Sequence, residues 1–258
     1  MAIDFHAEAN RRTYSGRRAD DSWRDAVGRL VEPVNAVVVD VGCGGGTYTR
    51  AWQELGAAMV LGVDFSDPML DAAREAHAGL PGVDFRQGEA AATGLADRCA
   101  DVVFERALVH HTPDLGAVAA EAFRVLHAGG TYLIQDRTAE DVAQPGSPTH
   151  PRGWLFEVHP RLLEVENRRR PDPAALATTL TAAGFDGVDA SSLWEVRRRY
   201  EDREQYLAEI GTRTGRSILH ELDDAELATL VDELRDRLPE GPLTETDRWT
   251  IWRATRPA

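Results

Sequence analysis

The chain has 258 residues, of which 43% are hydrophobic and 28% are charged. This length and composition allow a full hydrophobic core, so they exclude a disordered tail and a miniprotein that depends on disulfides. The formal net charge of −14 disfavours tight binding to nucleic acid or anionic lipid, because both require clustered lysines and arginines. A small molecule is therefore the expected partner, with no nucleic acid and no membrane.

The two cysteines, Cys43 and Cys99, are too few for a disulfide framework or a cysteine-rich zinc site. We therefore expect chemistry without a metal. The N-terminal residues lack the apolar segment of a secretion signal, and no stretch reaches the roughly 18 apolar residues of a membrane span. A cytoplasmic protein is expected, and the sequence leaves open whether it is a monomer or a homodimer.

Short apolar runs alternate with helical patterns in the first half of the chain. The runs predict buried strands at residues 37–41, 59–63, 83–86, 101–104 and 131–134. Helices are predicted between them at residues 47–55, 67–77 and 115–126, the second with Ser66 as its N-cap. This alternation indicates a parallel sheet with helices on both faces.

The second half of the chain begins after residues 143–151, AQPGSPTHP, which give the strongest linker signal. A helix is predicted at 173–183, strands near 188–196 and 248–253, and an amphipathic helical stretch at 202–238. The expected fold is α/β, Rossmann-like and doubly wound, with a mostly parallel seven-stranded sheet and helical lid insertions. We expect a helical segment at 1–35 that can cover a cofactor, a binding core at 36–136, and the remaining sheet at 137–258, with the lid at about 137–172 and 201–240.

A glycine-rich turn, in VVVDVGCGGGTYT, joins the first predicted strand to the first predicted helix. Its glycines let the backbone approach a ligand, and the helix N-terminus offers unpaired amides, so a nucleotide-like cofactor is expected. Thr47 stands where the dinucleotide fingerprint needs its third glycine, and no lysine follows as a phosphate loop requires. Asp64, at the end of the second predicted strand, is placed to accept hydrogen bonds from two ribose hydroxyls; the alternative is a turn or capping carboxylate.

Three further segments follow in order: QGEAAATGL, ADVVFERALVHHTPD and FRVLHAGGTYLIQD. Together with the glycine turn and Asp64, they resemble the class I S-adenosylmethionine-dependent methyltransferases of the ubiquinone/menaquinone-biosynthesis-like group. The resemblance covers the first 136 residues and implies S-adenosylmethionine as cofactor and S-adenosylhomocysteine as product. It implies cofactor contacts from the following residues: Asp40, Gly42, Cys43, Gly44, Gly46, Asp64, Phe65, Met69, Gly88, Glu89, Ala90 and Arg106. Glu89 stands where the family more usually has Asp.

His110 and His111 follow the fourth predicted strand, at the edge of the sheet where ligands bind in open α/β folds. A neutral imidazole is a natural base for an acceptor that must lose a proton. The alternative is that the pair shapes the loop beside the cofactor. Arg106 and Glu105 lie at the same edge and either orient the substrate or form a surface ion pair with one another, which is the expected role.

Tyr14, Trp154 and His159 are the candidates for contact with the acceptor. Aromatic residues around the lid either line an acceptor pocket or belong to the core: Trp154, Phe156, Trp194, Tyr200 and Tyr206. Two basic runs, 168–170 and 197–199, either receive a carboxylate or phosphate on the acceptor or form a solvated face, which is the expected role for most of them. The N-terminal residues Phe5, Tyr14, Arg17 and Trp23 are candidates for folding over the cofactor.

The sequence therefore predicts a methyltransferase that moves a methyl group from S-adenosylmethionine to O, N or C of a small-molecule acceptor by in-line displacement. Three alternatives remain: a protein that binds the same cofactor without methylating, a methyltransferase of RNA or protein, and an NAD(P)-dependent oxidoreductase. The last is disfavoured by Thr47.

Overall fold

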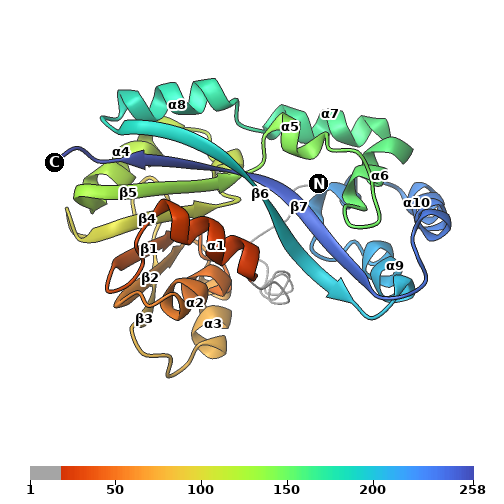
Figure 1. The fold of residues 1–258 in the computed structure, drawn as a ribbon, viewed down its shortest axis with the longest axis horizontal. Coiled ribbons are helices and arrows are strands. Elements are labelled where there is room, and N and C mark those ends of the chain that lie inside the picture. The colour runs from red at the N-terminus through yellow and green to blue at the C-terminus, as the bar shows by residue number, and fades with distance from the viewer. Residues whose placement is uncertain (1–18) are drawn as a thin grey trace.

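The computed structural model describes residues 19–258. Within them a seven-stranded sheet has the order β3-β2-β1-β4-β5-β7-β6 (Figure 1). Its strands are β1 (Val37–Val41), β2 (Met59–Asp64), β3 (Val83–Gln87), β4 (Ala100–Arg106), β5 (Leu126–Asp136), β6 (Asp186–Tyr200) and β7 (Leu243–Thr255). Strands β1 to β5 pair in parallel, and β7 runs antiparallel to β5 and β6. The predicted α/β, mostly parallel sheet is confirmed, and β5, β6 and β7 are longer than predicted.

Helices cover both faces of the sheet (Figure 1). One face carries α1 (Asp21–Leu30), α2 (Thr47–Glu54) and α3 (Asp67–Ala76), and the other carries α4 (Leu115–Val125) and α8 (Pro173–Ala182). The predicted cap of α3 is confirmed, because Ser66 Oγ accepts the Met69 amide at 3.4 Å. Trp23 on α1 is fully buried against Tyr48, Trp52 and Phe104, so it packs in the core and does not cover the cavity described below.

A second hydrophobic core lies beyond the sheet. It joins α6 (Arg152–Val158), α7 (Pro160–Arg169), α9 (Arg203–Gly211) and α10 (Asp224–Arg237), here called the C-terminal helical cluster, to the far ends of β6 and β7. Figure 1 shows β6 and β7 extending past the other strands to reach these helices. The short helices α5 (Ala139–Val142), η2 (Val109–His111) and η3 (Ser217–Glu221) complete the described elements.

Helices α6 and α7 fall within the predicted helical lid at about 137–172, where no individual helix was predicted, and the predicted helical stretch at 202–238 is divided into α9, η3 and α10. Gly215, with φ +67°, lies in the turn between α9 and η3. In residues 19–258, every helix is too short or too polar to cross a lipid bilayer.

Glu105, on β4, does not form the predicted surface pair with Arg106. Its side chain is buried, and Tyr132 is its hydrogen-bond partner, while its Oε2 has no partner among the described residues. Burial raises the pKa of Glu105 to about 8, against the lowering effect of the Tyr132 hydrogen bond, and the nearby Asp136 raises it further. The reason is topological: side chains alternate between the two faces of a strand, so adjacent residues point apart.

We expect Glu105→Gln to stabilise the protein at alkaline pH. The folded state keeps the Glu105 proton up to about pH 8, whereas the unfolded chain releases it above about 4.5, so the native free energy of unfolding falls as pH rises between these values. Glutamine has the same shape and no charge, so the variant is expected to gain about 2 to 4 kcal/mol at pH 8 and nothing at pH 4.5. Urea unfolding at both pH values tests this; an equal difference at both would contradict it.

Candidate functional site

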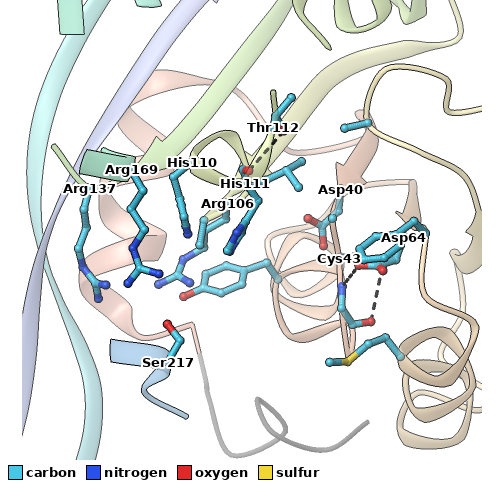
Figure 2. Close-up of a pocket in the computed structure, with 18 of the residues that line it drawn as sticks. Asp40, Cys43, Asp64, Arg106, His110, His111, Thr112, Arg137, Arg169 and Ser217 are labelled. Carbon is cyan, nitrogen blue, oxygen red and sulfur yellow. Dashed lines mark hydrogen bonds between the residues drawn. The ribbon is translucent and has the colours of Figure 1, made fainter. Parts of the chain in front are cut away.

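A cavity of about 640 Å³ lies at the carboxyl ends of β1, β2, β4 and β5, between the sheet and the C-terminal helical cluster. Sites for small molecules typically measure about 300–1,000 Å³. Figure 2 shows its two unlike sides, with Asp40, Cys43 and Asp64 on one and Arg106, Arg137 and Arg169 on the other. His110 lies among these arginine side chains, and His111 lies next to it on the side towards Asp40. A ligand in this cavity therefore meets carboxylates at one end and guanidinium groups at the other.

The glycine turn between β1 and α2 forms the acidic end. Gly44 has φ +52°, and a Cβ built there would meet nothing within 4 Å, so its backbone faces open space. Gly46 has φ +78°, and its Cβ would lie 2.8 Å from the rings of His77 and Phe85. Glycine is thus required at 46 by packing as well as by backbone conformation.

Asp64 ties this turn to the end of β2. Its Oδ2 accepts the Gly44 amide at 2.8 Å and its Oδ1 accepts the Ser66 amide at 2.9 Å. The carboxylate therefore has the turn-forming contacts of the alternative interpretation and also lines the cavity. A carboxylate oxygen can accept more than one hydrogen bond.

Asp40, at the end of β1, is buried beneath the turn, and its Oδ2 accepts the Thr49 hydroxyl at 2.6 Å. Burial raises the pKa of Asp40 to about 7; the Thr49 hydrogen bond opposes this rise and the nearby Asp64 adds to it. A bound cation would favour the ionised form. Burial also raises the pKa of the Cys43 thiol, with Asp40 and Asp64 adding to the effect, so this thiol is poorly suited to act as a nucleophile.

Most residues predicted to contact the cofactor come together in this cavity. Its lining includes Asp40, Gly42, Cys43, Gly44, Asp64, Phe65, Met69, Glu89, Ala90 and Arg106. Gly46 and Gly88 are not part of the lining. Close packing explains why residue 88 is glycine, since a Cβ there would lie 2.6 Å from the Thr93 carbonyl oxygen.

His110 is held by Asp136 at the end of β5. Its Nδ1 lies 2.8 and 3.0 Å from the two carboxylate oxygens of Asp136. Burial alone would raise the pKa of Asp136, but the hydrogen bond and charge of His110, with the charge of Arg170, lower it below its usual value. Because an ionised carboxylate only accepts, His110 Nδ1 must carry the proton, which leaves Nε2 as the basic nitrogen.

His111 lies against His110, with 4.0 Å between ring centroids. Burial, and then the neighbouring His110, lower the pKa of His111 to about 4. His111 is therefore neutral at physiological pH. Both histidines line the cavity, as predicted from their position after β4.

The basic end is formed by side chains that the sequence analysis largely assigned to solvent. Arg169 and Arg170, at the end of α7, and Arg197 on β6 line the cavity, whereas Arg168, Arg198 and Arg199 are exposed. The solvated-face prediction is thus wrong for half of the two runs. Helical spacing explains the positions of Arg169 and Arg170, because they follow Glu166 by three and four residues and contact its carboxylate.

Arg106 is also buried, and its partner is Glu195 on β6 at 2.8 Å. Its guanidinium lies over the rings of Tyr48 and Trp249, 4.3 and 4.1 Å from their centroids. No pattern in the sequence predicts this arrangement. It also missed further lining residues: Arg137, Arg152, Glu166, Arg216, Ser217 and Trp249.

The predicted acceptor contacts are wrong for two residues, and the third lies outside the described residues. Trp154 is buried in the second core, and His159 Nε2 lies 3.1 Å from the Glu226 carbonyl oxygen; neither lines the cavity. Phe156, Tyr200 and Tyr206 are core residues as well, and Trp194 is 44% exposed. The core alternative is thus confirmed for the buried aromatic residues. Phe5, Tyr14 and Arg17 lie outside the described residues.

Comparison with known proteins agrees with this geometry. Residues 39–134 match the family model for a methyltransferase domain. The malonyl-[acyl-carrier protein] O-methyltransferase of Serratia marcescens is 32% identical over 109 residues, which cover 42% of this chain and 41% of that protein. The ubiquinone/menaquinone biosynthesis C-methyltransferase UbiE of Acidiphilium cryptum is 27% identical over 188 residues, which cover 66% of this chain and 75% of that protein. The match thus spans less than half of the Serratia relative.

A solved structure shares the fold. Phosphoethanolamine N-methyltransferase 2 of Haemonchus contortus, in complex with S-adenosyl-L-methionine, aligns with a TM-score of 0.60 and 17% identity, covering 99% of this chain and 60% of that one. The family match, the relatives and the shared fold agree with the motifs, whose residues lie around one cavity. Residues 39–134 thus match a methyltransferase domain, and the chain is similar to the ubiquinone/menaquinone-biosynthesis methyltransferases.

Proposed function

We propose that this protein transfers a methyl group from S-adenosylmethionine to a small-molecule acceptor. The observation that carries the proposal is the acidic end of the cavity, where the exposed backbone of the glycine turn meets Asp40 and Asp64. A cationic nucleoside suits this end, because carboxylates attract its charge and accept its hydroxyls. A pyrophosphate suits it poorly, since both carboxylates would repel it.

The residues present fit this cofactor. Asp64 would hold the ribose hydroxyls and at the same time keep the glycine turn in place. Phe65, Met69 and Ala90 supply apolar surface for the adenine, with Glu89 as an acceptor beside them. Asp40 would compensate the positive charge.

The bound cofactor supplies a methyl group on a sulfonium, and the protein's task is to position the acceptor in line with it. His110 is the proposed base for an acceptor that must lose a proton, because Asp136 fixes its ring and leaves Nε2 free of that carboxylate. His111, neutral and packed against it, would help to shape the loop. The C-terminal helical cluster closes the other side, which we interpret as the lid that limits water.

A small acceptor is favoured over RNA or protein by where the arginines lie. Arg152 and Arg170 have side chains only 8% and 4% exposed, so they cannot form a basic surface for a macromolecule. The overall charge of −14 agrees with this. The second candidate is a protein that binds the cofactor without methylating. The histidine pair disfavours it, because a positioned base is of use only in a reaction.

S-adenosylhomocysteine is expected to stabilise the folded protein, whereas NAD and NADP are not. At about 100 times its Kd, a ligand adds about 2.7 kcal/mol of stability, which raises Tm by about 5 to 10 °C for a chain of this size. Thermal unfolding with each ligand measures this. Stabilisation by NADP alone would refute the proposal.

A further inference from the structure

The basic end of the cavity contains a carboxylate shared by several cations. Glu166 on α7 contacts the guanidinium groups of Arg152, Arg169 and Arg170, with 3.2 Å between its Oε1 and Nη2 of Arg152. Arg170 also reaches Asp136, with 3.3 Å between Nη1 and Oδ1. These arginines lie on two segments, α6 and α7, which converge on the cavity.

Arg137, directly after β5, adds a further charge to this group. It pairs with Asp247 on β7, and its guanidinium lies 3.9 Å from the ring centroid of Trp249. Burial lowers the pKa of Arg137; Asp247 opposes this effect, and the charges of Arg152 and Arg170 add to it. The neighbouring arginines are therefore close enough to repel it.

Each remaining arginine of the lining has a carboxylate partner. Arg197 and Arg216 share Glu209 and Glu245, the exposed Arg198 also contacts Glu209, and Arg106 pairs with Glu195. The group around Glu166 is different. It contains three carboxylates, those of Glu166, Asp136 and Asp247, and it contains four guanidinium groups, those of Arg137, Arg152, Arg169 and Arg170. Within the described part of the chain this group therefore has an excess of one positive charge.

An unmatched charge is costly at this depth, because water cannot solvate it fully. The side chains of Arg152 and Arg170 are 8% and 4% exposed, whereas that of Arg169 is 28% exposed and accessible from the cavity. Guanidinium groups bind carboxylates through paired hydrogen bonds, which are strong when water is excluded. A bound oxyanion would remove the excess.

We propose that the acceptor carries a carboxylate, which Arg137, Arg169 and Arg170 hold at the basic end of the cavity. This inference rests on the proposed function, since it names the acceptor class of the same site. A monocarboxylate matches the single excess charge. Held there, the acceptor extends towards His110, which lies among the arginine side chains in Figure 2, and His111, which lies next to it on the side towards Asp40.

The test is the binding of benzoate to protein saturated with S-adenosylhomocysteine, measured by calorimetry. Benzamide has nearly the same shape and no charge, so it is expected to bind at least about 10-fold more weakly. Arg169→Gln is expected to weaken benzoate about 10-fold, and Arg169→Lys less. Arg168→Gln is the matched control: this neighbour on α7 is exposed, does not line the cavity, and is expected to leave benzoate binding unchanged.

Folding and cofactor binding are checked in the same samples. Glu166 keeps Arg152 and Arg170 as partners in Arg169→Gln, so a Tm near that of the wild type is expected. S-adenosylhomocysteine affinity is expected to be the same in all variants. If the wild type fails to bind this nucleoside, the proposed function fails. Titrating benzoate and benzamide into the free protein still tests whether the arginines bind a carboxylate.

Two kinds of result would overturn the inference. The first is a lack of specificity: benzoate and benzamide bind equally, or Arg168→Gln and Arg169→Gln lose the same amount of benzoate affinity. The second concerns the cofactor's own carboxylate, which 5′-methylthioadenosine lacks. Benzoate that binds beside methylthioadenosine but not beside S-adenosylhomocysteine would show that the arginines hold the cofactor and not the acceptor.

Discussion

Replacing His110 by alanine is expected to lower kcat about 10² to 10⁴-fold for an acceptor that loses a proton, and to leave S-adenosylhomocysteine binding nearly unchanged. The reason is the contact with Asp136, which holds Nδ1 at 2.8 Å and leaves Nε2 as the basic nitrogen. In the wild type, Nε2 is placed to take the proton that the acceptor loses, and alanine has no group that can do so.

The measurement is the rate of single-turnover methyl transfer to a carboxylate acceptor. His127→Ala is the control, because His127 is exposed and outside the cavity, and it should behave as the wild type. Asp136→Asn should also lower kcat, since the amide no longer requires a proton on Nδ1. A His110→Ala rate equal to that of the wild type would mean that positioning alone drives the transfer.

Asp64→Ala is expected to weaken S-adenosylhomocysteine binding by about 1 to 3 kcal/mol, or roughly 5- to 150-fold. The change removes the proposed acceptor for the ribose hydroxyls and leaves the amides of Gly44 and Ser66 without their partner. The turn is then less well ordered before the ligand binds. Calorimetric titration gives the Kd, and thermal unfolding shows how much of the effect is on the fold.

Two further variants separate these contributions. Asp64→Asn keeps the size of the side chain but offers one oxygen in place of two, so only one of the two amides keeps its acceptor. Its affinity is expected to lie between the wild type and Asp64→Ala. Asp67→Ala removes an exposed carboxylate of the same sign from the first turn of α3 and should bind normally. Wild-type affinity in Asp64→Ala would refute the role in ribose binding.

The sequence by itself determined the sheet, the glycine turn and the acidic end of the cavity. Each is specified within a short segment: β-branched runs form strands, glycines at 44 and 46 allow positive φ, and Ser66 caps α3. Parallel strands also bring their carboxyl ends to one edge, so Asp64 and His110 were expected near the same cavity. These features depend on local order along the chain, which a sequence displays directly.

The basic end was decided by the tertiary structure alone. Arg106 forms an ion pair with Glu195, and Arg137 forms one with Asp247. The residues of each pair are far apart in the sequence, and they come into contact because β6 and β7 pass beside the cavity. Runs of arginine have the same appearance in sequence whether they face solvent or a cavity, since burial depends on what packs against them. The α7 helix therefore directs Arg169 inwards and leaves Arg168 outside, a distinction that requires the second core to be in place.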